Sequence, residues 1–257
     1  PVVLLLAGGK SERFWPFATK MLFPFLGVNI ILHQIKTLTA AGFDEVVIVA
    51  NESVAQHISG LPYPVVVQKG NGMAAAILSA QTYIRGRSCV VMIANDIVSP
   101  QFFNELQNHI KSYPEAIGLG VWKTESYLPM GYVTISDGHI IDIVEKPAPE
   151  KVPSDLVTVS SHYHPSGDVL CAILEKVRSE SDDQYEKALK KQMHDGVEFR
   201  PVICADTVAY LKYPWHILLV MQKLFEHMES YIAPTAQIDE TARISGPVFI
   251  EEGVRIM

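Results

Sequence analysis

Short apolar segments alternate with amphipathic ones from Val2 to Tyr113. Apolar runs of strand length are typical of parallel strands that are buried on both faces. The strands predicted in this way are Val2–Leu6, Glu45–Ala50, Val65–Gln68 and Cys89–Ala94. Helical spacing of apolar residues, or a proline in the first turn, predicts helices at Asn29–Ala41, Met73–Ile84 and Pro100–Tyr113. This alternation predicts an α/β protein with a mostly parallel sheet and helices on both of its faces.

The pattern changes after Ala116. Further strands are predicted at Ile117–Trp122, Tyr132–Ile135, Ile140–Glu145 and Val208–Leu211. Ser136-Asp137-Gly138 predicts a hairpin turn between two of these strands. Helices are predicted at Asp168–Arg178 and Trp215–Met228, and the polar segment Ser179–Lys191 is expected to be a solvated helix or loop.

The final segment has a different periodicity. Isoleucine recurs every sixth residue, and a small or β-branched residue follows four positions later. The isoleucines are 232, 238, 244, 250 and 256, and the following residues are Ala236, Ala242, Val248 and Val254. A period of six predicts a solenoid of short strands, so we divide the chain into residues 1–229 and a hexapeptide-repeat segment at 230–257. We also expect both ends of this chain to be incomplete, because it starts at Pro1 without methionine and stops at Met257 within the repeat.

Composition and charge narrow the function classes. Hydrophobic residues make up 48% of the chain and charged residues 19%, as in ordinary soluble globular proteins. With 21 Lys and Arg against 28 Asp and Glu, the net charge of −7 argues against nucleic-acid or anionic-membrane binding. A phosphate ligand would therefore need a local cluster of cations. Three cysteines without a CxxC pair predict a reduced, cytoplasmic protein.

A glycine pair follows the first predicted strand. Gly8-Gly9 can point backbone N–H groups at phosphates, and Lys10 and Arg13 add positive charge, although a tight structural turn would also use two glycines. The carboxyl ends of parallel strands lie at one edge of a sheet, where ligands bind. We therefore expect the candidate site at the ends of strands Val2–Leu6, Val65–Gln68 and Cys89–Ala94.

Five ordered motifs resemble those of the sugar-1-phosphate nucleotidylyltransferases. The family's opening motif, LAGGxGTRLxPLT followed by PKxLxP, corresponds to LAGGKSERFWPFATKMLFPFLGVNI at residues 6–30. The other corresponding segments are Gln68–Ala74 (QKGNGMA), Asn95-Asp96, Glu145-Lys146-Pro147 and Tyr213–Leu218 (YPWHIL). The resemblance implies a Rossmann-like nucleotide-diphospho-sugar transferase fold, followed in many members by a left-handed β-helix.

The resemblance also implies a reaction and a set of site residues. An NTP and a sugar 1-phosphate would give an NDP-sugar and pyrophosphate with Mg²⁺ as cofactor, and homo-oligomers are common in the family. By resemblance, Arg13, Lys20 and Lys146 are catalytic; Ala7, Gly8, Gly9, Ser11, Gln68 and Gly72 bind the nucleotide; Gly131 and Glu145 bind the sugar; and Asp96 binds the metal.

Several positions depart from the family pattern. Ser11 replaces the third glycine of the opening loop, and Tyr210 stands where a second metal-binding aspartate is usual. Tyrosine cannot replace a carboxylate on a hard cation, and Asp206 is either its substitute or a structural residue. The sugar-pocket element NAGIYxF is degraded to Val159–His164. Within it, His162 and His164 alternate onto one face, as metal ligands would, but we expect them to be surface histidines.

These departures leave more than one function open. The first hypothesis is the nucleotidylyltransferase, with its base and sugar unresolved. The second is a metal-deficient regulatory homologue that binds a nucleotide or NDP-sugar without turnover. A third, an acyltransferase in a longer hexapeptide domain, is neither supported nor excluded by these residues. No Ser/His/Asp or Cys/His set predicts a nucleophile.

Overall fold

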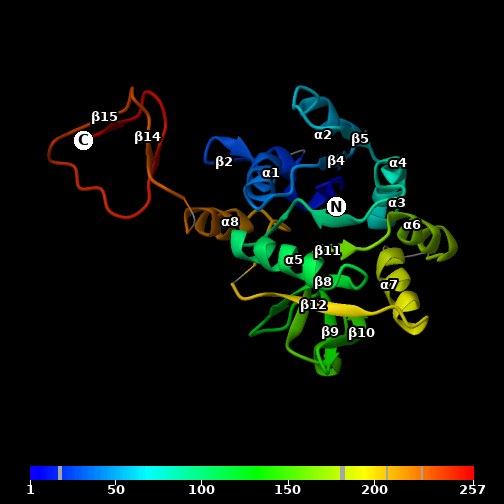
Figure 1. Ribbon diagram of the computed structural model, residues 1–257. Coiled ribbons are helices and arrows are strands. Elements are labelled where there is room, and N and C mark those ends of the chain that lie inside the picture. The colour runs from blue at the N-terminus through cyan, green and yellow to red at the C-terminus, as the bar shows by residue number, and fades with distance from the viewer. Residues whose placement is uncertain (17–18, 180–182, 207, 227) are drawn as a thin grey trace.

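The computed structural model describes residues 1–16, 19–179, 183–206, 208–226 and 228–257 (Figure 1). Within these residues, nine strands form one mixed sheet. They are β1 (Val2–Ala7), β4 (Val46–Ala50), β5 (Val65–Val67), β6 (Cys89–Ile93), β8 (Ile117–Lys123), β9 (Gly131–Ser136), β10 (His139–Glu145), β11 (Leu156–His164) and β12 (Phe199–Cys204). The order runs β10-β9-β11-β6-β1-β4-β5, and β8 pairs with both β11 and β12.

The helices cover both faces of this sheet (Figure 1). They are α1 (Ile30–Ala40), α2 (Glu52–His57), α3 (Gly72–Ser79), α4 (Gln81–Ile84), α5 (Pro100–Ser112), α6 (Gly167–Lys176), α7 (Gln184–His194) and α8 (His216–Phe225), with short 3₁₀ turns η1 (Glu12–Phe14), η2 (Lys20–Leu22) and η3 (Pro149–Lys151). Side chains of α1, α2, α5 and α8 pack in one core, and those of α3, α4, α6 and α7 in the other. Strand β1 supplies both cores, because Val3 and Leu5 face one and Leu4 and Leu6 the other. This confirms the two-layered helix cover predicted from the alternation.

The sheet is less parallel than predicted. Strands β6, β1, β4 and β5 are parallel to one another, but β11 is antiparallel to β6, β8 and β9. Strand β12 was not predicted, and β11 was considered only as a possible strand at His162 and His164, although it crosses the centre of the sheet. Ser161, His162 and His164 of β11 are polar but buried, so the hydropathy pattern does not indicate an interior strand there. The predicted helix Met73–Ile84 is divided at Ala80 into α3 and α4.

Two expectations about exposure are wrong. His162 and His164 are buried, and the hydroxyl of Tyr185 lies 2.8 Å from Nδ1 of the first and Nε2 of the second. Burial lowers the pKa of His162 to about 4 and of His164 to about 3, so both rings are neutral at pH 7. Tyr185 belongs to α7, which is a packed helix rather than a solvated segment, since Leu189 is buried as well. Residues 180–182 and 227 of the predicted segments lie outside the described residues.

Four short ladders complete the described structure. Their strands are β2 (Pro24–Phe25) with β3 (Val28–Asn29), β7 (Asp96–Ile97) with β13 (Ala209–Tyr210), β14 (Tyr231–Ile232) with β16 (Phe249–Ile250), and β15 (Gln237–Ile238) with β17 (Arg255–Ile256). In the last two, Tyr231 pairs with Phe249 and Gln237 with Arg255, both in parallel and 18 residues apart. This spacing equals three of the six-residue repeats. Figure 1 shows this segment beyond α8, away from the large sheet.

Within the described residues, none of the helices is both long enough and apolar enough to cross a membrane.

Candidate functional site

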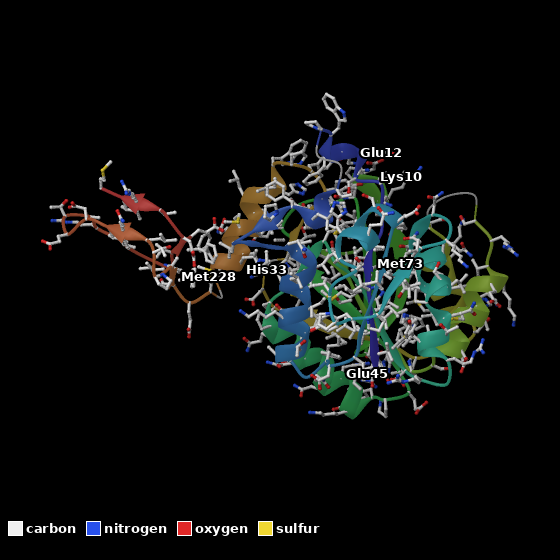
Figure 2. All side chains as sticks on the ribbon, turned by 90° about the horizontal axis from the view of Figure 1, so that it is seen from above. Lys10, Glu12, His33, Glu45, Met73 and Met228 are labelled. Carbon is white, nitrogen blue, oxygen red and sulfur yellow. The ribbon has the colours of Figure 1, made fainter. Side chains whose placement is uncertain are left out.

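The loop after β1 carries the glycine pair at the carboxyl edge of the sheet. Gly9 has φ +106°, a conformation that favours glycine, and its carbonyl accepts a hydrogen bond from Asn51 Nδ2 at 2.9 Å. Ser11 is also left-handed, and its Oγ accepts a hydrogen bond from Lys20 N at 3.2 Å. Figure 2 shows Lys10 and Glu12 of this loop at the opposite end of the sheet from Glu45. The loop is therefore held in place by the segment that contains Lys20.

Gln68 closes one side of this loop. A Cβ atom at Gly8 would clash with Gln68 Oε1, so only glycine permits this close approach. The Gln68 Nε2 atom donates hydrogen bonds to the carbonyls of Gly70 and Gly72, both at 3.1 Å. The structure thus brings together two of the predicted nucleotide-binding segments, while Ala7 lies buried at the end of β1.

Asp96 is buried within electrostatic range of the Lys20 and Lys212 ammonium groups. Its side chain is 3% exposed, and its oxygens accept hydrogen bonds from Ser160 N at 3.4 Å and Asn95 Nδ2 at 3.2 Å. Burial raises the pKa of Asp96, and the positive charges of Lys212 and Lys20 oppose this shift. The carboxylate therefore depends on nearby ammonium groups for its charged form.

Burial also shifts the pKa values of the two lysines, Lys20 and Lys212. Desolvation lowers the pKa of Lys20 to about 8 and also lowers that of Lys212, while Asp96 opposes both shifts. The charge of Arg13 lowers the pKa of both ammonium groups further, so the guanidinium lies within electrostatic range of them. Arg13 itself lies 5.2 Å from the centre of the Tyr213 ring. Two ammonium groups therefore share one buried carboxylate, and the Arg13 guanidinium adds a third positive charge within range of both.

The predicted sugar-binding residues lie where β9 meets β10. Gly131 pairs with Glu145, and a Cβ at Gly131 would lie 3.0 Å from Glu145 Oε2. Lys146 Nζ is 2.8 Å from Glu145 Oε1, and the charge of Lys146 lowers the pKa of Lys212. Lys212 thus lies in electrostatic range both of the Asp96 group and of the Glu145–Lys146 pair. Prediction from sequence missed Lys212, although its place immediately before the Tyr213-Pro214-Trp215 motif was a usable signal.

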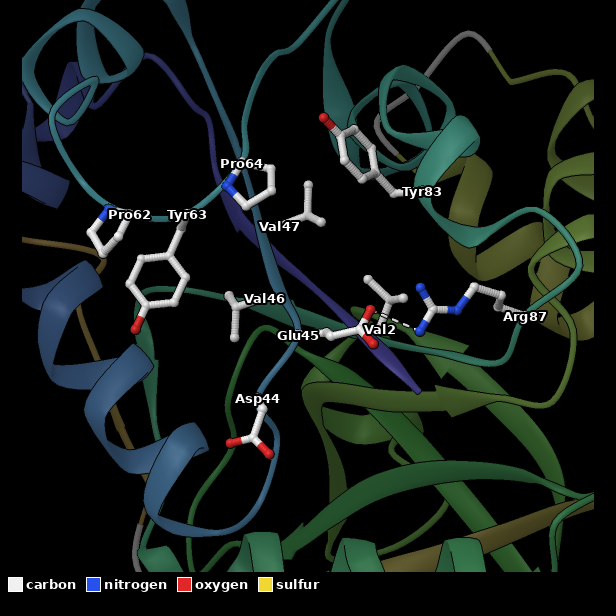
Figure 3. A pocket seen from close by; sticks show the side chains of 10 residues that line it. All are labelled: Val2, Asp44, Glu45, Val46, Val47, Pro62, Tyr63, Pro64, Tyr83 and Arg87. Atoms are coloured by element: carbon white, nitrogen blue, oxygen red, sulfur yellow. Dashed lines mark ion pairs between the residues drawn. The ribbon is translucent and has the colours of Figure 1, made fainter.

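Another concave region lies elsewhere. Figure 3 shows a pocket at the amino ends of β1 and β4, where Glu45 pairs with Arg87 at 2.8 Å and which Tyr63 and Tyr83 also line. It lies at the opposite end of the parallel strands from Gly8. The carboxyl edge, with its cations and close backbone approach, is the better candidate for a phosphate ligand.

Comparisons with known proteins identify the family of the chain. The family model described as the MobA-like NTP transferase domain matches residues 3–237. The chain belongs to this family. Among curated proteins, the bifunctional protein GlmU of Methanococcus maripaludis strain C7 is 25% identical over 98% of this chain, and that of strain S2 is 26% identical. The chain spans 61% of the length of these curated relatives.

Solved structures share the fold of this NTP transferase domain. A UDP-glucose pyrophosphorylase from Acinetobacter baumannii superposes with a TM-score of 0.74 at 16% identity, covering 88% of this chain and 94% of that one. A UDP-glucose pyrophosphorylase complexed with UDP-glucose gives a TM-score of 0.74 at 18% identity, covering 88% and 98%. At such identities the likeness establishes the architecture.

The side chains around Asp96 differ from those that usually hold Mg²⁺ in a protein. Mg²⁺ prefers oxygen ligands, usually one or two carboxylates with phosphates and water. Tyr210 pairs directly with Asp96 across β13 and β7, so a tyrosine stands opposite Asp96 at the position where the resemblance implies a second carboxylate. Asp206 lines a different groove, between α5 and β12 with Gln101, and does not take over that place. Among the described residues, no three His, Cys, Asp or Glu side chains gather as a metal site. The donor set does not fit a metal ion held by the protein itself.

Proposed function

We propose that this NTP transferase domain moves a nucleotidyl group from an NTP to a sugar 1-phosphate. The observation that carries the proposal is the gathering of Arg13, Lys20 and Lys212 beside the Gly8-Gly9 loop in a chain of net charge −7. Local positive charge against a negative background favours a polyphosphate ligand. Membership of the NTP transferase family supports the nucleotide, and the GlmU relatives and UDP-glucose pyrophosphorylase fold support the sugar phosphate.

In the proposed reaction, an oxygen of the sugar phosphate attacks the α-phosphorus of the NTP. The bond from the α-phosphorus to the bridging oxygen breaks, and pyrophosphate leaves with that oxygen. Two anions must approach each other, so positioning and charge neutralisation are the main tasks of the protein. Arg13 and Lys20 would neutralise the triphosphate, and Lys146 would meet the sugar phosphate. The amides after Ala7, including those of Gly8, Gly9 and Ser11, would line the phosphates.

Recognition of the two substrates is assigned to separate parts of the site. Gln68 and Gly72 would recognise the base, supported by the hydrogen bond that joins them at 3.1 Å. Gly131 and Glu145 would line the sugar pocket, where the absence of a Cβ at Gly131 lets the carboxylate approach the backbone closely. Mg²⁺ at Asp96 belongs to the family expectation, but Tyr210 and the two lysines disfavour a resident ion, and no step here depends on one.

A second candidate function is favoured by the same substitutions. Tyr210 opposite Asp96 is what a regulatory homologue would show if it bound a nucleotide or NDP-sugar without turning it over. Binding would then need the loop and cations, but catalysis would be lost. The two candidates differ in pyrophosphate release and agree in nucleotide affinity.

The organisation around this site is also proposed. We assign residues 1–229 to the catalytic domain and residues 230–257 to the start of a left-handed β-helix, supported by parallel pairing at the spacing of three repeats. Homo-oligomers would cover isoleucines such as Ile232 and Ile244, which are 46% and 39% exposed here. All three cysteines are unpaired, which supports a reducing compartment such as the cytoplasm.

The deciding experiment measures pyrophosphate release from UTP, dTTP, GTP, CTP and ATP with a panel of sugar 1-phosphates. Calorimetric titration of the same nucleotides runs in parallel, and Lys20→Ala serves as the inactive reference. Release with one base would identify the donor. Binding without release on every sugar would support the regulatory function instead. Absence of both release and binding would contradict the assignment of a nucleotide site.

A further inference from the structure

The backbone on either side of Lys212 is fixed against the Asp96 segment. Tyr210 pairs with Asp96, and Leu211 N donates to the Asn95 carbonyl at 2.9 Å. The carbonyl of Leu211 accepts a hydrogen bond from Lys20 Nζ, also at 2.9 Å. The backbone N–H of Lys212 donates to His216 Nδ1 at 3.2 Å. Lys212, which follows β13, is therefore positioned by the contacts of Tyr210 and Leu211 with the Asp96 segment and with Lys20.

The side chain of Lys212 is half-buried, and its charge is compensated only in part, because the Asp96 carboxylate also acts on Lys20. Its Nζ lies 5.3 Å from the centre of the Tyr210 ring. Within the described parts of the chain, this ammonium has no hydrogen bond or ion pair. By contrast, Lys20 donates to Leu211, and Lys146 pairs with Glu145. A half-buried ammonium without a partner is costly, and an anionic ligand would remove that cost.

The charge around Asp96 is arranged for an anion rather than for a second cation. Among the charges that act on the Asp96 carboxyl, Lys212 has the larger effect and Lys20 the smaller. A divalent cation at this carboxylate would face two ammonium groups, with a phenol where its second carboxylate would lie. A triphosphate beside this group would be attracted by the ammonium groups of Lys20 and Lys212 and repelled by the one carboxylate of Asp96.

We propose that Lys212 takes the place of the divalent cation, neutralising the nucleotide phosphates directly, so that nucleotide binding needs no added metal. This inference rests on the proposed function, because it assumes that a nucleotide binds at this site. Tyr210 and Lys212 act together in it: the phenol removes a metal ligand, and the ammonium supplies the missing charge. Lys212 is thus a phosphate-binding residue.

The test is a calorimetric titration of the tightest-binding NTP into the whole chain, with EDTA and with Mg²⁺. The wild type should bind equally in both conditions, within about threefold. Lys212→Met should weaken binding in EDTA about ten- to a hundredfold, the loss expected for one charge-assisted contact. Lys212→Arg should bind as the wild type does, since it keeps the charge. Lys111→Met, which removes an exposed lysine of α5, is the matched control and should bind normally.

A second variant tests the exchange in the opposite direction. Tyr210→Asp combined with Lys212→Gly restores a second carboxylate and removes the ammonium, so its nucleotide binding should become dependent on Mg²⁺. Two results would overturn the role of Lys212 but leave the nucleotide site intact. One is nucleotide binding by the wild type that requires Mg²⁺. The other is normal nucleotide binding in EDTA by a Lys212→Met variant whose circular dichroism is unchanged. If no NTP binds with or without Mg²⁺, the proposed function itself fails and this inference fails with it.

Discussion

Replacement of Gly8 by alanine tests whether the loop after β1 and the Gln68 side chain form one unit. Gly8 is not in the left-handed region, so backbone strain is not expected. The added methyl group would overlap Gln68 Oε1 and lie 3.2 Å from its Cδ. Gln68 must then move, and its Nε2 would lose the hydrogen bonds to Gly70 and Gly72.

The size of the effect follows from these two hydrogen bonds. A neutral hydrogen bond contributes about 1 kcal/mol net to folding, which sets an upper value of about 2 kcal/mol for the pair. Water can replace partners at this partly exposed position, so the free energy of unfolding should fall by about 1 kcal/mol. Because Gln68 is proposed to contact the base, nucleotide affinity should fall about tenfold.

Urea unfolding and calorimetric nucleotide titration would measure both effects in a double-mutant cycle. The four proteins are the wild type, Gly8→Ala, Gln68→Ala and the double variant. Gly60→Ala is the matched control, because no atom lies within 4 Å of the added Cβ. Gly8→Ala should cost little stability once Gln68 is truncated. An equal cost in both backgrounds would show that the clash is not with Gln68, and the reasoning would be wrong.

Three further outcomes follow from the site and the tail. Nucleotide affinity should fall as pH rises through about 8, where Lys20 loses its proton in the folded protein. The free energy of unfolding should rise between pH 8 and 10.5, because in this range Lys20 is protonated only in the unfolded chain. Lys20→Met should flatten both pH profiles, and unchanged profiles in this variant would contradict the role of Lys20. Asp96→Asn should not lower the thermal midpoint, because burial raises the pKa of Asp96 and so disfavours its charged form; a clear drop in the midpoint would mark the Asp96 carboxylate as structural. Ile250→Asp should destabilise the tail by roughly 1–2 kcal/mol more than Ile244→Asp, because Ile250 is 6% exposed and Ile244 is 39% exposed. Nucleotide affinity should stay constant in both variants, and an affinity loss in either one would argue against separate domains.

The sequence by itself determined the elements whose burial is simple. A strand such as β1 is buried on both faces, so it reads as an unbroken apolar run, and the predicted Val2–Leu6 differs from the observed strand by one residue. Asn29 likewise begins α1 as predicted, with its Oδ1 accepting from Leu32 N at 3.1 Å. The six-residue period of the tail also depends only on local spacing, and it reappears in the 18-residue separation of the paired strands.

Tertiary structure decided the features that depend on polar groups meeting across the fold. Strand β11 and helix α7 were missed or misjudged because His162 and His164 are polar in sequence and become interior only through Tyr185. In the same way, the motifs located Asp96 and Lys20, but only the pairing of β13 with β7 places Lys212 beside them. Hydropathy records the cost of burying a polar group, whereas the partner that offsets this cost is distant in sequence and is supplied by the fold.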